Sequence, residues 1–191
     1  MTFAFNRHPD LVGKHAFVSA SKNSWINYDD EKFVASIYKS VAAARGTRLH
    51  ELARALIFDG VKLAATSQTL NLYVNDAIGY RMDPEVVLYY SKNAFGTADA
   101  ISFRDGVLRI FDLKTGVIPA KEVQLELYAA FFCLEYGVKP LGIEYDLRIY
   151  QNDNIEFYDT DPERVAWLMS RIVEADKLIK IAEAEEVYVG R

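Results

Sequence analysis

Cysteine is nearly absent from the chain, since Cys133 is the only one among 191 residues. A single cysteine cannot form an internal disulfide or build a metal cluster that needs several thiolates. Cys133 lies in the apolar stretch YAAFFCLEYG, where a helix facing the core is expected. The sequence therefore predicts a buried, structural thiol at this position.

Long apolar runs are absent as well. The chain has no stretch of about 18 apolar residues, which is the length that a membrane-spanning helix needs. The first residues, MTFAFNRHPDLVGKH, contain no apolar core of a secretory signal. We therefore expect a protein of the cytoplasm that has no membrane partner.

An excess of basic charge is missing too. The chain carries 22 lysines and arginines against 27 aspartates and glutamates, which gives a formal net charge of −5. This balance argues against a protein that coats nucleic acid through bulk positive charge. It does not exclude an enzyme acting on nucleic acid, because acidic metal ligands lower the net charge and bound cations neutralise them.

The chain does contain enough apolar sequence for a core. Hydrophobic residues make up 51% and aromatic residues 13%, with no repeat or low-complexity linker. One compact domain over residues 1–191 is therefore expected. Within it we distinguish an N-terminal helical segment (1–45), a central core (46–150), and a C-terminal strand and helix (151–191).

The apolar spacing alternates between the helical period and the two-residue period of strands. Helices are predicted at 29–64, 67–78, 120–136 and 162–185. Strands are predicted at 85–91, 97–103, 107–113, 142–150 and 155–159. Gly46 is a point at which the first helix could divide in two. The order favours an α/β or α+β fold, with a mixed central sheet flanked by helices.

One predicted hairpin brings two acidic residues together. With Asp105-Gly106 as the turn, counting back along both strands places Asp99 opposite Asp112, with Cβ atoms roughly 5 Å apart. Lys114 lies two residues beyond Asp112 and so joins the same face. Nearer the turn, that face carries apolar residues: Ile101, Phe103, Leu108 and Ile110.

Two interpretations of this cluster stay open, a solvated group of charges at a strand end or a metal site. Opposed carboxylates at the edge of a core repel each other, which raises the pKa of one of them. A divalent cation removes the conflict, and oxygen ligands suit a hard metal such as Mg²⁺ or Mn²⁺. Small residues beside the acids would leave room for access: Gly96, Thr97 and Gly116.

Residues on two predicted helices could complete such a site. His50 precedes the strands and would add an imidazole ligand, unless it is simply packed there. Gln124 and Tyr128 are four residues apart and so share a face of the helix that follows Lys114. The His50 helix also carries basic residues that would contact phosphates or simply be solvated: Arg45, Arg48 and Arg54.

Taken in order, these segments resemble the PD-(D/E)xK nuclease superfamily. They are Gly46-Thr47…His50, Gly96-Thr97-Ala98-Asp99, Asp112-Leu113-Lys114 and Gln124-x-x-x-Tyr128. The helical histidine and the Q-x-x-x-Y motif are similar to the RecB-like exonuclease branch. The resemblance spans residues 46 to 128, and the rest of the chain is similar to small phage-encoded members of that branch.

The resemblance implies a restriction-endonuclease-like core and a role for each matched residue. The ligands of Mg²⁺ or Mn²⁺ would be His50, Asp99, Asp112 and the backbone carbonyl of Leu113. The catalytic residues would be Asp99, Asp112 and Lys114, with the lysine activating the attacking water. The contacts to DNA would be made by Gln124, Tyr128 and Arg48. Glu51, beside His50, would be a substitute ligand or an outer base.

The chain departs from the superfamily pattern in places. Asp99 follows Gly-Thr-Ala, so the Pro-Asp pair that names the superfamily is absent. One subgroup holds an iron–sulfur cluster with four cysteines, and with Cys133 alone no such cluster is expected. The chain has no G-x-x-x-x-G-K-[ST] motif, so a helicase motor would have to be another protein.

The implied function is metal-dependent hydrolysis of DNA phosphodiester bonds by an exonuclease of phage recombination, replication or DNA degradation. Three alternatives stay open: a structure-specific endonuclease, a non-catalytic DNA-binding or assembly module on the same fold, and an unrelated metal enzyme such as a phosphatase. The implied partners are DNA and either a second copy of the chain or a recombination or replication protein. The location would be the cytoplasm of the host.

Overall fold

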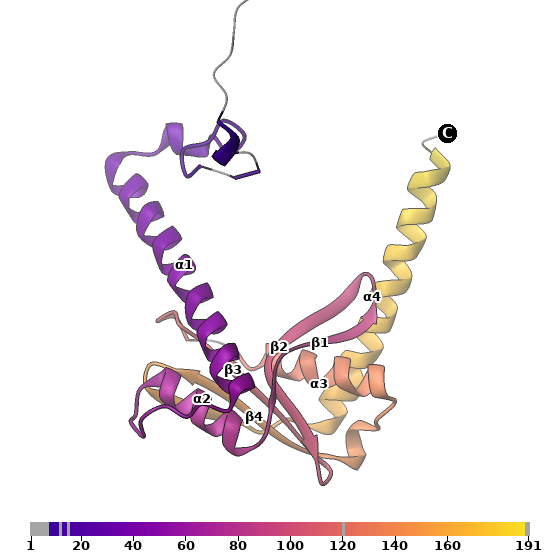
Figure 1. Cartoon of the computed structure of the whole chain (residues 1–191). Helices are drawn as coiled ribbons and strands as arrows, with labels where there is room; N and C mark the ends of the chain where they lie inside the picture. Colours follow the sequence, from indigo (N-terminus) through magenta and orange to yellow (C-terminus); the bar gives the residue numbers. More distant parts are fainter. Residues whose placement is uncertain (1–7, 12, 15, 120, 190–191) are drawn as a thin grey trace, which may run out of the picture. The chain divides into compact units, whose positions relative to one another are not determined.

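A computed structural model describes residues 8–11, 13–14, 16–119 and 121–189 (Figure 1). The chain forms two compact units, Met1–Ala43 and Ala44–Arg191, and helix α1 (Asp30–Asp59) contributes to both. In the first unit, short 3₁₀ helices precede α1: η1 (Pro9–Leu11) and η2 (Ser24–Asn27). The second unit carries the sheet and all residues of the predicted site.

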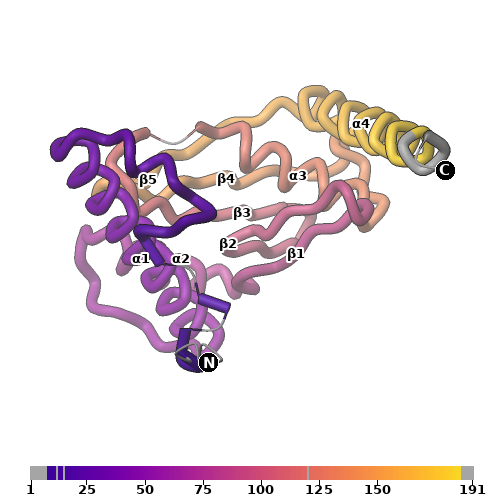
Figure 2. The backbone as a smooth tube through the Cα atoms, turned by 90° about the horizontal axis from the view of Figure 1, so that it is seen from above, coloured from indigo at the N-terminus to yellow at the C-terminus, as the bar shows by residue number. Residues whose placement is uncertain are grey.

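Within the described residues, five strands form one sheet in chain order, as Figure 2 shows. They are β1 (Asp83–Ser91), β2 (Ala94–Arg104), β3 (Val107–Leu113), β4 (Glu144–Gln151) and β5 (Asn154–Tyr158). Neighbouring strands are antiparallel except β3 and β4, which are parallel. This mixed sheet with flanking helices confirms the predicted α+β class.

Helices cover both faces of the sheet. The second half of α1 and helix α2 (Thr69–Gly79) pack on one face. Helices α3 (Val123–Tyr136) and α4 (Pro162–Val189) pack on the other. Helix α3 joins the parallel strands β3 and β4, which need such a crossover. None of the described helices has the length and apolar content that crossing a membrane requires.

The β2–β3 turn is the one predicted from sequence. Arg104 pairs with Val107, which leaves Asp105 and Gly106 as the two turn residues. Both have positive φ angles, 52° and 77°, as the tight turn of a twisted two-stranded ribbon requires. The register counted from this turn is therefore correct along the paired part of the hairpin.

The expected division of the first helix at Gly46 is wrong. Helix α1 continues through this residue, although glycine inside a helix costs roughly 0.5–1 kcal/mol relative to alanine. A Cβ atom at Gly46 would lie 2.7 Å from Oγ1 of Thr115, which follows β3. The position is therefore occupied by glycine because the helix passes so close to Thr115 that a side chain would not fit.

Cys133 is buried on α3, as predicted, and burial raises the pKa of its thiol to about 11. At pH 8 only about one thiol in a thousand is then ionised, and the thiolate is the reactive form. We expect a disulfide reagent such as DTNB to label the native protein very slowly at pH 8 and the denatured protein at once. Rapid labelling without denaturant would contradict this burial.

Candidate functional site

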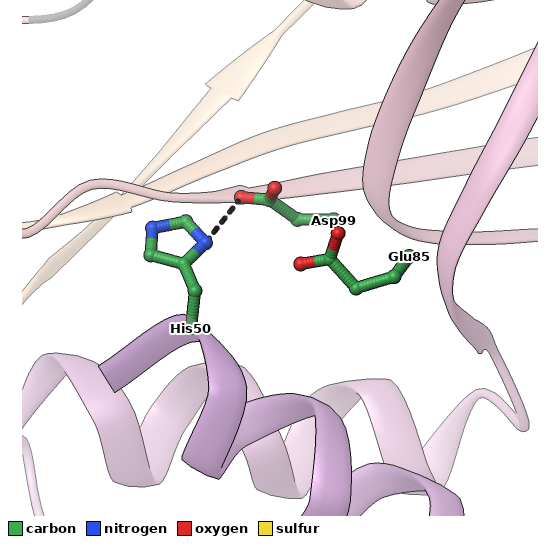
Figure 3. A group of neighbouring side chains, drawn as sticks. All are labelled: His50, Glu85 and Asp99. Carbon is green, nitrogen blue, oxygen red and sulfur yellow. Dashed lines mark ion pairs between the residues drawn. The ribbon is translucent and has the colours of Figure 1, made fainter. Parts of the chain in front are cut away.

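Three side chains from α1, β1 and β2 converge on one point. His50, Glu85 and Asp99 offer ligand atoms that all lie within 4.8 Å of one another. Figure 3 shows the imidazole of His50 pointing from its helix toward both carboxylates. One nitrogen and two carboxylate groups form a donor set that suits a divalent cation.

Asp99 is fixed in place by contacts from two directions. His50 Nδ1 lies 3.5 Å from Asp99 Oδ2. The same oxygen accepts a hydrogen bond of 2.9 Å from the backbone N–H of Leu113, at the end of β3. The backbone N–H of Leu113 therefore lies beside the acid, and its carbonyl stays a predicted ligand. Contact with Asp99 also raises the pKa of His50, and this outweighs the lowering caused by burial.

Glu85 was not predicted from the sequence and enters the site through strand pairing. Pro84 pairs with Ala100 and Val86 with Ala98, so Glu85 lies opposite Asp99. Its φ angle is 53°, a left-handed conformation that costs a residue other than glycine roughly 1–3 kcal/mol. The pairing on either side holds the backbone in this strained conformation next to His50 and Asp99.

Strand β2 changes the face that it presents at Asp99. Ala98 belongs to the core beneath α3, whereas Ala100 belongs to the core beneath α1 and α2. Residues two apart on a regular strand share a face, so the alternation is broken between them. The paired residues of the β2–β3 hairpin also end at Ala100 and Phe111, one step short of Asp99 and Asp112. Asp99 is thereby directed to His50 and to the end of β3.

Asp112 lies outside the group of three and holds Lys114. Only 1% of Asp112 is exposed. Lys114 Nζ donates a hydrogen bond of 3.0 Å to its Oδ1 and lies 2.8 Å from its Oδ2. Burial raises the pKa of Asp112 and the charge of Asp99 raises it further, while Lys114 acts against both. The two acids are therefore close enough to repel, as predicted.

Gln124 and Tyr128 orient the lysine. Lys114 Nζ donates a second hydrogen bond, of 2.9 Å, to Gln124 Oε1. Gln124 Nε2 in turn donates to Tyr128 Oη at 2.8 Å. Tyr128 is buried, so its position supports this orienting role more than the predicted contact with DNA. Tyr128 thus holds the amide of Gln124, and this amide fixes the direction of the Lys114 ammonium group.

Gly96 makes room for Tyr128, although it was expected to leave room for access to the acids. A Cβ atom at Gly96 would lie 2.9 Å from Cε1 of Tyr128. We expect Gly96→Ala to displace the tyrosine, loosen Gln124 and lower the melting temperature, because the added methyl meets the tyrosine ring. Thermal melts are compared with those of Gly142→Ala, whose added methyl meets nothing within 4 Å. Equal melting temperatures for both variants would show that the tyrosine yields to the added methyl without cost.

Two predicted residues lie close to His50 in sequence but on other faces of α1. Arg48 and Glu51 are exposed on α1, and residues two or one positions from His50 point away from its face. Arg54 is four residues on and shares that face. Its charge lowers the pKa of Glu85, against the raising effects of burial and Asp99. Arg54 therefore borders the site, and the contact of Arg48 with DNA stays a prediction.

A cavity of about 200 Å³ adjoins the lysine. It is lined by Leu49, Thr69, Leu70, Leu113, Lys114, Thr115, Gly116 and Asn152. Gln151 Nε2 donates to the backbone carbonyl of Ile118 at 2.8 Å and to that of Gly116. Asp153 accepts hydrogen bonds from the backbone and hydroxyl of Thr69 at 2.8 and 3.1 Å. Two lining residues, Thr69 and Gly116, are therefore held in place by hydrogen bonds.

Comparison of the chain with protein-family models, with curated proteins and with solved structures finds no match in any of the three. Function is therefore inferred from the geometry of the site and from the resemblance of its motifs.

Proposed function

We propose that the protein is a divalent-metal-dependent deoxyribonuclease that hydrolyses DNA phosphodiester bonds, most simply as an exonuclease. One observation carries the proposal. His50, Glu85 and Asp99 form a compact donor group, and Asp99 is coupled to a buried Asp112 that holds Lys114. A lysine fixed next to a group that could hold a metal suits phosphodiester hydrolysis, because it would stabilise the negative charge that develops on the phosphate.

The residues fit Mg²⁺ or Mn²⁺ by their chemistry. Carboxylate oxygens with one imidazole nitrogen are donors that these ions accept. The acids are also short of positive charge, because Asp99 raises the pKa of both Glu85 and Asp112. A bound cation relieves this repulsion. It would lower the pKa of a coordinated water and neutralise charge on the scissile phosphate.

Lys114 supplies a second positive charge that does not depend on a metal. Asp112 and Gln124 hold its ammonium group from two sides, and 29% of the side chain stays exposed. This exposed part can stabilise negative charge on the phosphate and hold the attacking water. The lysine, glutamine and tyrosine together favour a nuclease over an unrelated metal enzyme such as a phosphatase.

The cellular part of the proposal follows from the resemblance. We place the protein in the cytoplasm, in phage recombination, replication or DNA degradation. Its partner would be DNA, together with a second copy of the chain or a recombination or replication protein. A structure-specific endonuclease uses the same residues, and the substrate that is cleaved separates the two.

The test uses purified protein with end-labelled single-stranded, linear duplex and circular DNA. We expect linear DNA to be degraded with Mg²⁺ or Mn²⁺, not with EDTA, and circular DNA to persist. Nicking of the circle would select the endonuclease. A failure to cleave any of these substrates with either metal would overturn the enzymatic proposal and leave the DNA-binding module as the alternative.

Metal binding itself is expected to depend on Asp99. Mn²⁺ titrated into the wild-type protein should release or absorb heat with one saturable phase and should raise the melting temperature. Asp99→Ala removes the acid shared by His50 and Leu113 and should abolish both effects. Asp105→Asn, in the β2–β3 turn, is the matched control and should bind Mn²⁺ as the wild type does. Unchanged binding by Asp99→Ala would contradict the assigned ligand group.

A further inference from the structure

The β1–β2 ribbon presents an exposed apolar face that its fold does not require. Tyr89 pairs with Phe95 and Val87 with Thr97. Of these residues, Val87 is 52%, Tyr89 49% and Phe95 57% exposed. The alternate residues of the ribbon pack beneath α3 and form that side of the core: Val86, Leu88, Tyr90, Ala94 and Ala98. Two facing aromatic rings are therefore placed in solvent, on the side opposite the core.

This face is continuous with the candidate site. Every second pair along the two strands lies on this face, so Glu85 and Asp99 follow the Val87–Thr97 pair on it. The two strands run together as a curved ribbon in Figure 1. With about 3.4 Å per residue, the Tyr89–Phe95 pair lies roughly 14 Å along the ribbon from the Glu85–Asp99 pair. An extended single strand of nucleic acid spans such a distance with a few nucleotides.

Several features favour bases over another protein as the occupant. Aromatic rings stack on any base, and a strand whose phosphate lies at Asp99 would reach them by following the ribbon. Positive charge borders the path at the end nearest the candidate site, where Arg54 lies near Glu85. The edge strand is also blocked for strand addition at this point, because the backbone N–H of Tyr89 already donates to Glu135 Oε2 at 2.7 Å.

We infer that Tyr89 and Phe95 form a stacking platform for unpaired bases of the DNA strand that enters the site. This inference rests on the proposed nuclease function and narrows its substrate class. The DNA must present a single-stranded segment a few nucleotides long beside the scissile phosphate. Single strands and duplexes with overhangs are then the preferred substrates, and blunt duplexes are cleaved more slowly.

The test measures binding separately from cleavage, using 12-nucleotide single strands that carry 2-aminopurine and a terminal fluorophore. Proteins carry Lys114→Ala to limit cleavage. Stacking on the platform should quench the 2-aminopurine fluorescence. The Tyr89→Ala/Phe95→Ala double variant should lose this quenching and bind roughly tenfold or more weakly by anisotropy. The swap Tyr89→Phe/Phe95→Tyr keeps both rings and should retain both signals.

Phe58→Ala is the matched control, because Phe58 is an exposed aromatic residue on α1 that is 82% exposed. Its binding should equal that of the parent protein. Binding and quenching by the alanine double variant equal to those of the parent protein would overturn the platform. So would a double variant that differs from the parent only in self-association on size-exclusion chromatography. If the wild-type protein cleaves no DNA but the rings still govern binding, the platform stands and the nuclease function fails. If cleavage occurs and the rings do not matter, only the platform fails.

Discussion

Replacing Lys114 with alanine is expected to lower metal-dependent DNA cleavage by roughly 10²–10³-fold, the usual effect of removing one positioned electrostatic group. Mn²⁺ binding should stay within a few fold, because His50, Glu85 and Asp99 remain. In the proposed mechanism the ammonium group acts on the phosphate, so the loss should appear in the rate at saturating metal. Single-turnover cleavage measured across Mn²⁺ concentrations separates the two quantities.

The variant also tests the role of Asp112. Without Lys114 the buried carboxylate loses its cation, and its pKa should rise further, since Lys114 is the main influence that lowers it. A buried group without its partner costs about 1–3 kcal/mol, so a modest fall in melting temperature is expected. Lys121→Ala, an exposed lysine that follows the same strand, is the control. Cleavage by Lys114→Ala at the control rate would remove this residue from the mechanism.

The β2–β3 hairpin shows what the sequence can predict about this site. An Asp-Gly turn has one dominant backbone geometry, so it fixes the register for several residues on each side. Counting from it correctly located the neighbourhood of Asp99, Asp112 and Lys114. The change of face at Asp99 was not predictable, because it depends on the contacts that His50 and Leu113 make with the folded strand.

Glu85 shows why the same counting fails on the neighbouring hairpin. Ser91 pairs with Ala94 across the β1–β2 turn, and a regular register counted from that pair places Val86 opposite Asp99. A shift between Tyr89 and Ser91 moves the pairing by one residue and brings Glu85 there instead. One inserted residue therefore places the acid Glu85, in place of the apolar Val86, opposite Asp99. Such bulges depend on packing across the sheet, which local sequence does not report.

Arg148 is expected to be the charged residue outside the site whose loss destabilises the fold most. It lies on β4 and is only 9% exposed. Its Nε and Nη2 atoms donate to both carboxylate oxygens of Asp146, at 2.7 and 2.8 Å. It also donates to Tyr80 Oη at 3.1 Å and to Asp76 Oδ2 at 3.3 Å. The guanidinium group is therefore the only cation shown holding Asp76 among the described residues.

Aromatic rings surround the same group. The guanidinium carbon lies 4.6 Å from the ring centre of Phe111 and 4.8 Å from those of Tyr80 and Phe157. Phe111 precedes Asp112 on β3, so this cluster supports the strand that carries the site. A planar, delocalised cation can stack on rings and donate to a carboxylate in a fork, which the ammonium group of lysine cannot do.

We expect Arg148→Met to lower the free energy of unfolding by about 3–5 kcal/mol, because it leaves Asp76 without its cation in a largely buried cluster. Asp146 loses the fork and keeps only Arg109, whose Nε lies 3.4 Å from its Oδ2. Arg148→Lys keeps the charge but loses the fork and the stacking, so an intermediate loss is expected. Arg171→Ala removes an exposed pair with Glu174 on α4 and should cost less than about 1 kcal/mol. Urea unfolding followed by circular dichroism measures all three. Equal midpoints for Arg148→Met and Arg171→Ala would show that the buried cluster contributes no more than a surface ion pair. The idea that the cluster supports β3, through Phe111 beside Asp112, would then fail as well.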